Sequence, residues 1–107
     1  MKLMVRFRGV DATAAMLDHV KVVLAEAMMD VDARRASVLL SSEGGYCECL
    51  VEIGLSRGAV WVVRSGSDDA LVALEAAGDR VASLVAADRL RGPAHARLSR
   101  DAARRAA

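Results

Sequence analysis

The sequence predicts an α+β fold, a two-layer sandwich in which both helices cover one face of a four-stranded mixed sheet. Three observations predict it: four stretches with strand character, two longer stretches with apolar residues at three- and four-residue steps, and their order, β-α-β-β-β-α. The first β-α-β unit implies parallel strands joined by a right-handed crossover, and the remaining strands are expected to follow as antiparallel neighbours.

The first strand and the first helix have clear boundaries in the sequence. Residues 2–8 alternate apolar and polar side chains, as in a strand with one buried face, and Gly9 ends this stretch. Thr13 is the expected N-cap of the helix that follows, because its hydroxyl can accept a hydrogen bond from an amide of the first turn. The apolar stripe predicts that this helix closes before Asp30.

Three further strands are expected to form a meander. A short run over residues 36–42 is followed by Gly44-Gly45, the strongest turn signal in the chain. Residues 46–55 alternate again, and residues 59–64 are rich in side chains that favour strands. The order of these stretches predicts antiparallel pairing between neighbours.

The second helix is expected to open at Ser67, Asp68 and Asp69. This segment offers a hydroxyl cap and two carboxylates where the helix dipole favours negative charge. The helix is expected to stop at Gly92-Pro93, because proline cannot continue a helix.

The net charge of +1 hides an uneven distribution. Residues 1–88 hold nine basic and thirteen acidic residues, whereas residues 89–107 hold six Arg and one Asp. We divide the chain into an α+β domain over residues 1–91 and an Arg-rich, flexible C-terminal tail over residues 92–107. The alternative for residues 94–107 is a marginal helix with Arg97, Arg100 and Arg104 along one side. A basic tail on a mildly acidic body indicates contact with an anionic partner.

Several protein classes are excluded by composition and motif content. No apolar stretch approaches the roughly 20 residues that a membrane span needs, and charges interrupt the apolar N-terminal residues, so we expect neither a membrane protein nor a signal peptide. Cys47 and Cys49 provide no disulfide framework, fit a reducing cytoplasm and are expected to be small core residues. No P-loop, nucleophile elbow, zinc-ligand spacing or dinucleotide fingerprint occurs. We therefore expect no catalytic residue, metal, cofactor or small-molecule substrate.

Three segments resemble one known protein family. Residues 7–13 look like a strand-end glycine followed by a helix-capping hydroxyl, residues 13–20 are similar to the opening of the family's first helix, and residues 67–74 to the opening of its second. The family is the ribosome hibernation-promoting factor and ribosome-associated inhibitor A group, also called the sigma-54 modulation family. The resemblance covers residues 2–91.

The resemblance implies a cytoplasmic, non-enzymatic protein that binds the small ribosomal subunit. Family members lie in the channel used by messenger and transfer RNA and so idle ribosomes during starvation, a stress response that regulates translation. They bind with Lys and Arg spread over the domain. Here Val23 stands where the first helix of relatives typically has Lys, and small residues replace the basic end of the second helix, so we expect a diverged member.

The candidate RNA-binding residues are all basic. Each nucleic-acid phosphate that a protein neutralises requires a cation, and Arg presents a planar fork of donors that suits phosphate oxygens. The alternative is that these side chains are solubilising charges on an exposed strand face and a solvated tail. The candidates are Lys2, Arg6, Arg8, Arg34, Arg35, Arg80, Arg89, Arg91, Arg97, Arg100, Arg104 and Arg105.

A second hypothesis concerns the sheet face that the helices leave open. The predicted strand phases place several apolar side chains on this face, and clustered exposed apolar residues indicate a protein interface. On this hypothesis the domain has lost RNA affinity and pairs through the open face, as a homodimer or with a protein partner. The candidate residues are Met4, Tyr46, Leu50, Val60 and Val62.

Overall fold

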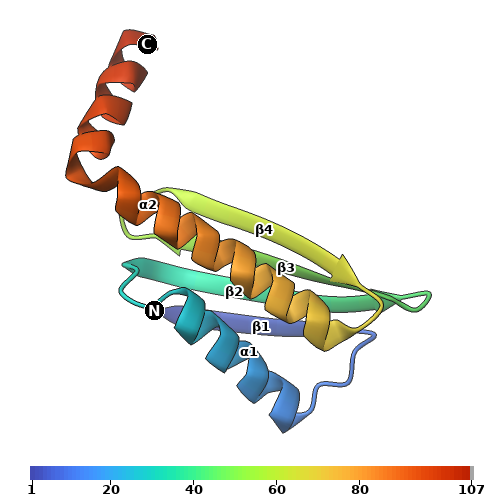
Figure 1. The fold of residues 1–107 in the computed structure, drawn as a ribbon. Coiled ribbons are helices and arrows are strands. Elements are labelled where there is room, and N and C mark those ends of the chain that lie inside the picture. The colour runs from blue at the N-terminus through green and yellow to red at the C-terminus, as the bar shows by residue number, and fades with distance from the viewer. Residues whose placement is uncertain (107) are drawn as a thin grey trace.

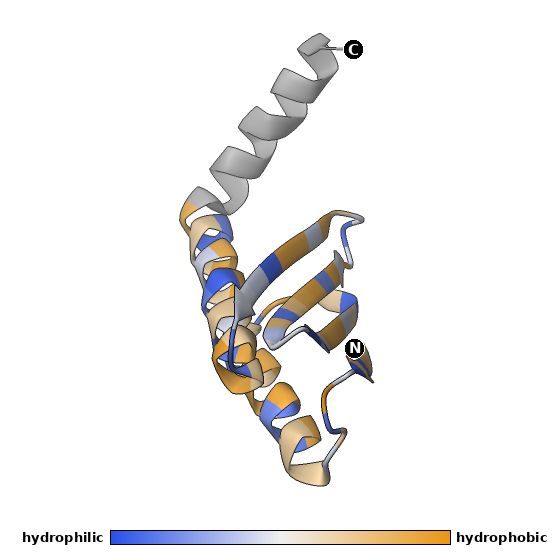
Figure 2. Cartoon of the chain, turned by 90° about the vertical axis from the view of Figure 1, so that its right-hand side faces the viewer, coloured by the Kyte–Doolittle hydropathy of each residue, from blue (hydrophilic) through white to orange (hydrophobic). Residues whose placement is uncertain are grey.

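Four strands form a single sheet in the order β1-β2-β3-β4, and both helices lie on the same side of it (Figure 1, Figure 2). The computed structural model describes the backbone of residues 1–106 and the side chains of residues 1–90. β1 and β2 pair in parallel, whereas β3 pairs antiparallel with both β2 and β4, so the predicted fold class is confirmed. The elements are β1 (Lys2–Arg8), α1 (Ala14–Ala27), β2 (Ala33–Glu43), β3 (Tyr46–Leu55), β4 (Val60–Ser67) and α2 (Ala70–Ala106).

β1 and α1 begin and end where the sequence indicates. Side chains of β1 alternate between half-buried and exposed, and its half-buried members pack against the core. The hydroxyl of Thr13 caps α1 by accepting a hydrogen bond from the Met16 amide at 3.1 Å. Asp30 follows the helix in the left-handed conformation, with a φ of 62°, and turns the chain toward β2.

β2 and β4 are both longer than predicted. β2 starts earlier because Ala33 and Arg35 pair with the last residues of β3, and Arg34 lies at a register irregularity between them. The sequence prediction begins this strand only at residue 36, because the residues before it are mostly polar. β4 continues beyond its predicted end because Ser65, Gly66 and Ser67 pair with the first residues of β3. The buried Ser65 hydroxyl also donates a hydrogen bond to the Ala73 carbonyl of α2.

The core lies between the sheet and the helix layer. In β4, Val63 faces this core, whereas Val60 and Val62 face away and are 55% and 58% exposed. The predicted phase of this strand is therefore confirmed. The largest fully buried side chains are Leu24, Leu40, Ile53, Leu74, Val20, Val38, Val51, Val81 and Cys49.

α2 begins with a different cap from the one predicted. The Asp69 Oδ1 accepts hydrogen bonds from the amides of Leu71 at 2.8 Å and Val72 at 3.2 Å. The Ser67 hydroxyl instead accepts from the Asp69 amide at 3.2 Å. Ser67 is still the last residue of β4, so it lies too early in the chain to cap α2. Asp69 is therefore the N-cap.

The predicted end of α2 at Gly92-Pro93 is wrong, because the helix runs to Ala106. Proline inside a helix removes one backbone hydrogen bond and favours a kink, but Ala, Leu and Arg, which dominate this segment, are strong helix formers. The predicted division into a domain over residues 1–91 and a flexible tail over residues 92–107 stays a prediction, since the tail side chains lie outside the described residues.

The two helices approach each other closely at Gly78. A Cβ atom at this position of α2 would lie 2.5 Å from Cγ1 of Val23 on α1. Glycine therefore lets both helices pack side by side over the sheet. Neither helix, over the part that the structure describes, combines the length and apolar character needed to cross a membrane.

Candidate nucleic-acid interface

The open sheet face is the side of the sheet that the helices do not cover. Figure 2 shows the helices on one side of the strands only. Because side chains alternate along a strand, the residues on this face are every second residue of β1 to β4. On β1 they are Lys2, Met4, Arg6 and Arg8, all of which are exposed.

Strand pairing brings Arg35 of β2 beside this group. In the parallel register, Lys2 lies opposite Arg35, Arg6 opposite Leu39 and Arg8 opposite Ser41. We call Lys2, Arg6, Arg8 and Arg35 the basic strip. All four side chains are exposed, and they come from two neighbouring strands of a packed sheet.

Within the described residues, the basic strip forms no close ion pair, although Glu48 and Glu52 lie on the same sheet face. Among residues 1–90, none of the ion pairs involves a member of the strip. Arg64, which lies across the same face on β4, is different because its Nε is 2.9 Å from Oε1 of Glu48. The strip therefore occupies the β1 side of the face, and the β4 side carries a paired cation.

Two depressions lie on the open sheet face. The first is lined by Lys2, Arg6, Arg35 and Ser37 on one side and by Glu52 and Val60 on the other. The second depression is lined by Arg8, Ser41, Glu48, Leu50 and Arg64, among others. Both combine strip cations, Ser hydroxyls and a carboxylate of β3.

The other predicted RNA-binding residues do not join the strip. Arg34 is exposed at the irregular start of β2, and Arg80 is exposed on α2, on the helix side of the sheet. Arg89 donates a hydrogen bond to the Met29 carbonyl and lies 3.8 Å from the Asp30 carboxylate, so it holds α2 to the loop after α1. The side chains of Arg91, Arg97, Arg100, Arg104 and Arg105 lie outside the described residues.

The predicted apolar interface is divided by polar residues. Met4, Tyr46, Val60 and Val62 are 49% to 58% exposed, and Leu50 is half-buried. The register places Ser37 and Glu52 between Met4 and Val62. Val60 and Val62 remain as a small apolar pair on the edge strand, with the half-buried Trp61 between them in sequence.

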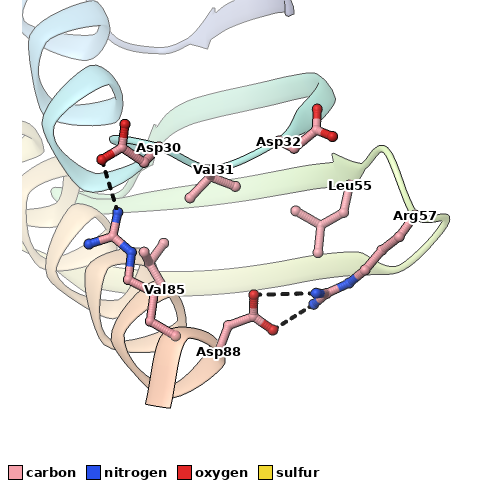
Figure 3. A pocket seen from close by; sticks show the side chains of 8 residues that line it. Asp30, Val31, Asp32, Leu55, Arg57, Val85 and Asp88 are labelled. Atoms are coloured by element: carbon pink, nitrogen blue, oxygen red, sulfur yellow. Dashed lines mark hydrogen bonds and ion pairs between the residues drawn. The ribbon is translucent and has the colours of Figure 1, made fainter. Parts of the chain in front are cut away.

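A further group of charged side chains lines a pocket at the end of the sheet (Figure 3). Arg57, in the turn after β3, donates two hydrogen bonds to Asp88 of α2, at 2.7 and 3.3 Å. Asp32 accepts a hydrogen bond from the Ser56 hydroxyl at 2.7 Å. The first contact holds α2 to the turn after β3, and the second joins that turn to the loop before β2. No sequence pattern predicts these contacts, because the partners lie far apart in the chain.

The helix layer carries charge of the opposite sign. The groove between α1 and α2 is lined by three carboxylates, from Glu26, Glu75 and Asp79, together with His19. An RNA backbone is repelled by such a surface. The basic strip therefore faces away from the acidic side of the molecule.

Among the residues that the structure describes, no group of three His, Cys, Asp or Glu side chains is placed to hold a metal ion. Cys47 and Cys49 are buried, as predicted. Burial raises the pKa of the Cys49 thiol to about 11, so this group stays protonated near neutral pH.

Comparisons with known proteins agree on the fold. No protein-family model and no curated protein matches the sequence. Among solved structures, the N-terminal domain of Thermus thermophilus Protein Y is similar with a TM-score of 0.69 and 25% identity, over 79% of this chain and 96% of that one. A ribosomal subunit interface protein from Coxiella burnetii is similar with a TM-score of 0.75 and 12% identity, over 84% and 99% of the two chains. These likenesses confirm the resemblance that the sequence indicates.

Proposed function

We propose that this chain, which resembles the ribosome hibernation-promoting factor family in sequence and in structure, is a ribosome-binding factor without catalytic activity. The support is the likeness to Protein Y and to a ribosomal subunit interface protein. The finer part of the proposal is that the basic strip contacts RNA of the small subunit. A protein with this role works in the cytoplasm and limits translation under stress.

The observation that carries the proposal is the position of the basic strip. Its four cations lie on one face, make no ion pair within the described residues and point away from the acidic groove. Residues two apart on a strand are separated by about 6.6 Å. Arg6 and Arg8 are therefore spaced to contact successive groups of an extended anionic backbone. Lys2 lies further along β1, beyond Met4, and Arg35 lies beside Lys2 on β2.

Counterion release gives the proposal a quantitative form. Four neutralised phosphates predict that the logarithm of the binding constant falls with the logarithm of salt concentration with a slope of about −3. The tail arginines, from Arg91 to Arg105, would steepen this slope if they also contact RNA.

The experiment is co-sedimentation of the full chain with purified small ribosomal subunits. Arg6→Glu should lower the affinity about tenfold or more, because it removes one phosphate contact and adds a repulsive charge. Lys21→Glu on α1 makes the same charge change on the helix layer and should leave binding near the wild-type level. Failure of the wild-type chain to sediment at low salt, or equal losses in both variants, would contradict the proposal.

A second candidate function is self-association through β4. Val60 and Val62 are more than half exposed on an edge strand, where unpaired backbone groups can accept another strand. Size-exclusion chromatography with light scattering tests it. A dimer that Val62→Glu dissociates supports pairing through β4, and a monomer at all concentrations rules it out.

A further inference from the structure

We infer that the depression at the Lys2 end of the open sheet face is a subsite for a single phosphodiester group, in which Gly54 positions Arg35. This inference rests on the proposed function, because it names the place where an RNA backbone is held most tightly. Gly54 is a positioning residue, and Arg35 is the residue that would contact the phosphate.

The position of Arg35 depends on the missing side chain of Gly54. The two residues are directly paired between β2 and β3. A Cβ atom at Gly54 would lie 3.1 Å from both Cγ and Nε of Arg35, and 3.7 Å from its Cδ. The Arg35 side chain therefore lies along the sheet surface, over the one position of this row that offers no side chain.

This arrangement prepares the guanidinium group for binding. A free arginine side chain loses conformational entropy, worth up to about 2 kcal/mol, when a ligand orders it. Arg35 is already laid against a strand, so part of that cost is met in the folded protein. Arg35 is also one of the residues that line the depression, so its planar fork of donors is available to a ligand there.

The remaining lining of the depression suits a phosphate. Lys2 lies opposite Arg35 on β1, Arg6 lines the same hollow, and Ser37 supplies a hydroxyl. Phosphate offers several acceptor oxygens, which match a fork of Arg donors, an ammonium group and a hydroxyl donor. Met4 and Val60 at the rim are apolar and could lie against the sugar.

Glu52 opposes this ligand. It is the carboxylate in the lining of the depression, and it pairs directly with Ser37 across β2 and β3. Its charge lowers the affinity for any anion that enters. Removing the Glu52 charge should therefore strengthen binding. A variant that merely damaged the fold would weaken binding instead.

The test measures fluorescence anisotropy of a short fluorescein-labelled single-stranded oligoribonucleotide with the full chain. Arg35→Ala should weaken binding about tenfold, the value of one charge-assisted hydrogen bond. Gly54→Val should weaken it about threefold or more by displacing Arg35, and thermal unfolding should show that this variant is folded. Glu52→Gln should strengthen binding about threefold.

A double-mutant cycle separates positioning from general damage. Gly54→Val should have no further effect once Arg35 is replaced by Ala, because there is then no guanidinium group to position. Independent losses from the two changes would overturn the role of Gly54. Glu26→Gln on α1 removes the same charge on the opposite side, and an equal gain from it would show an effect of net charge only.

The two proposals fail in different ways. If the wild-type chain does not sediment with small subunits, the proposed function is wrong. If it sediments but Arg35→Ala, Gly54→Val and Glu52→Gln bind the oligoribonucleotide as the wild type does, or if the wild type does not bind it, the subsite is wrong while ribosome binding stands.

Discussion

The two outer surfaces of this molecule have opposite electrostatic character. The groove between α1 and α2 presents Glu26, Glu75 and Asp79, whereas the open sheet face presents the basic strip along β1 and β2. Residues 1–88 carry an excess of acidic residues, yet they include all four cations of the strip. The difference teaches that the net charge of a domain does not describe the local surface that a charged partner meets.

The largest expected effect comes from reversing two charges of the basic strip. The double variant Arg6→Glu, Arg8→Glu should lower the affinity for small ribosomal subunits about a hundredfold, because two phosphate contacts are lost. The slope of the logarithm of affinity against the logarithm of salt should fall to about half of its wild-type value. Co-sedimentation across a salt series measures both quantities. An unchanged slope would show that other residues carry the electrostatic contacts.

The second prediction disturbs the helix layer instead. Gly78→Ala should lower the free energy of unfolding by about 1 to 3 kcal/mol, because the new Cβ meets the stiff Val23 side chain. Urea denaturation measures the change. Adding Val23→Ala should restore part of the stability, and ribosome binding by the folded variant should be unaffected. Full stability of Gly78→Ala would mean that the helices can separate without cost.

The third prediction concerns Cys49, which lies on the buried side of the sheet. Because burial raises the pKa of the Cys49 thiol to about 11, the unfolded chain loses this proton at lower pH than the folded chain does. Cys49 therefore contributes stability that is present below pH 9 and is lost as the pH rises toward 11. The loss is about 2 kcal/mol relative to Cys49→Ala, measured by urea denaturation at each pH. Identical pH profiles for the two proteins would contradict it.

The smallest expected effect concerns the ion pair between Arg57 and Asp88 at the end of the sheet. Arg57→Ala removes the two hydrogen bonds to Asp88, but both side chains are partly exposed, so the free energy of unfolding should fall by less than about 1 kcal/mol. High salt should reduce the difference between variant and wild type. Thermal unfolding at two ionic strengths provides the measurement, and a loss of several kcal/mol would show that the pair is shielded from solvent.

The fold was predictable because its signals are local. Alternation in residues 46–55 places the buried and open faces of β3, and the Thr13 hydroxyl marks the start of α1 before any tertiary contact is known. The start of β2 was not predictable in this way. Ala33 and Arg35 become strand residues through pairing with β3, which local polarity does not reveal.

The candidate site was predictable only in part. The alternation of side chains along β1 places Lys2, Arg6 and Arg8 on one face. Arg35 lies beside them because of the parallel register between β1 and β2, which a sequence pattern does not specify. Its contact with Gly54 depends on a second register, between β2 and β3. The binding roles of all these residues stay predictions.

The parallel pairing of β1 with β2 has a consequence for how the protein is made. β1 is synthesised first, yet its neighbour in the sheet follows only after the whole of α1. Until β2 has been translated, the cations of β1 belong to a nascent segment without fixed spacing, and Lys2 has no Arg35 beside it. The four cations of the proposed RNA-contacting face are therefore brought together only when the crossover closes.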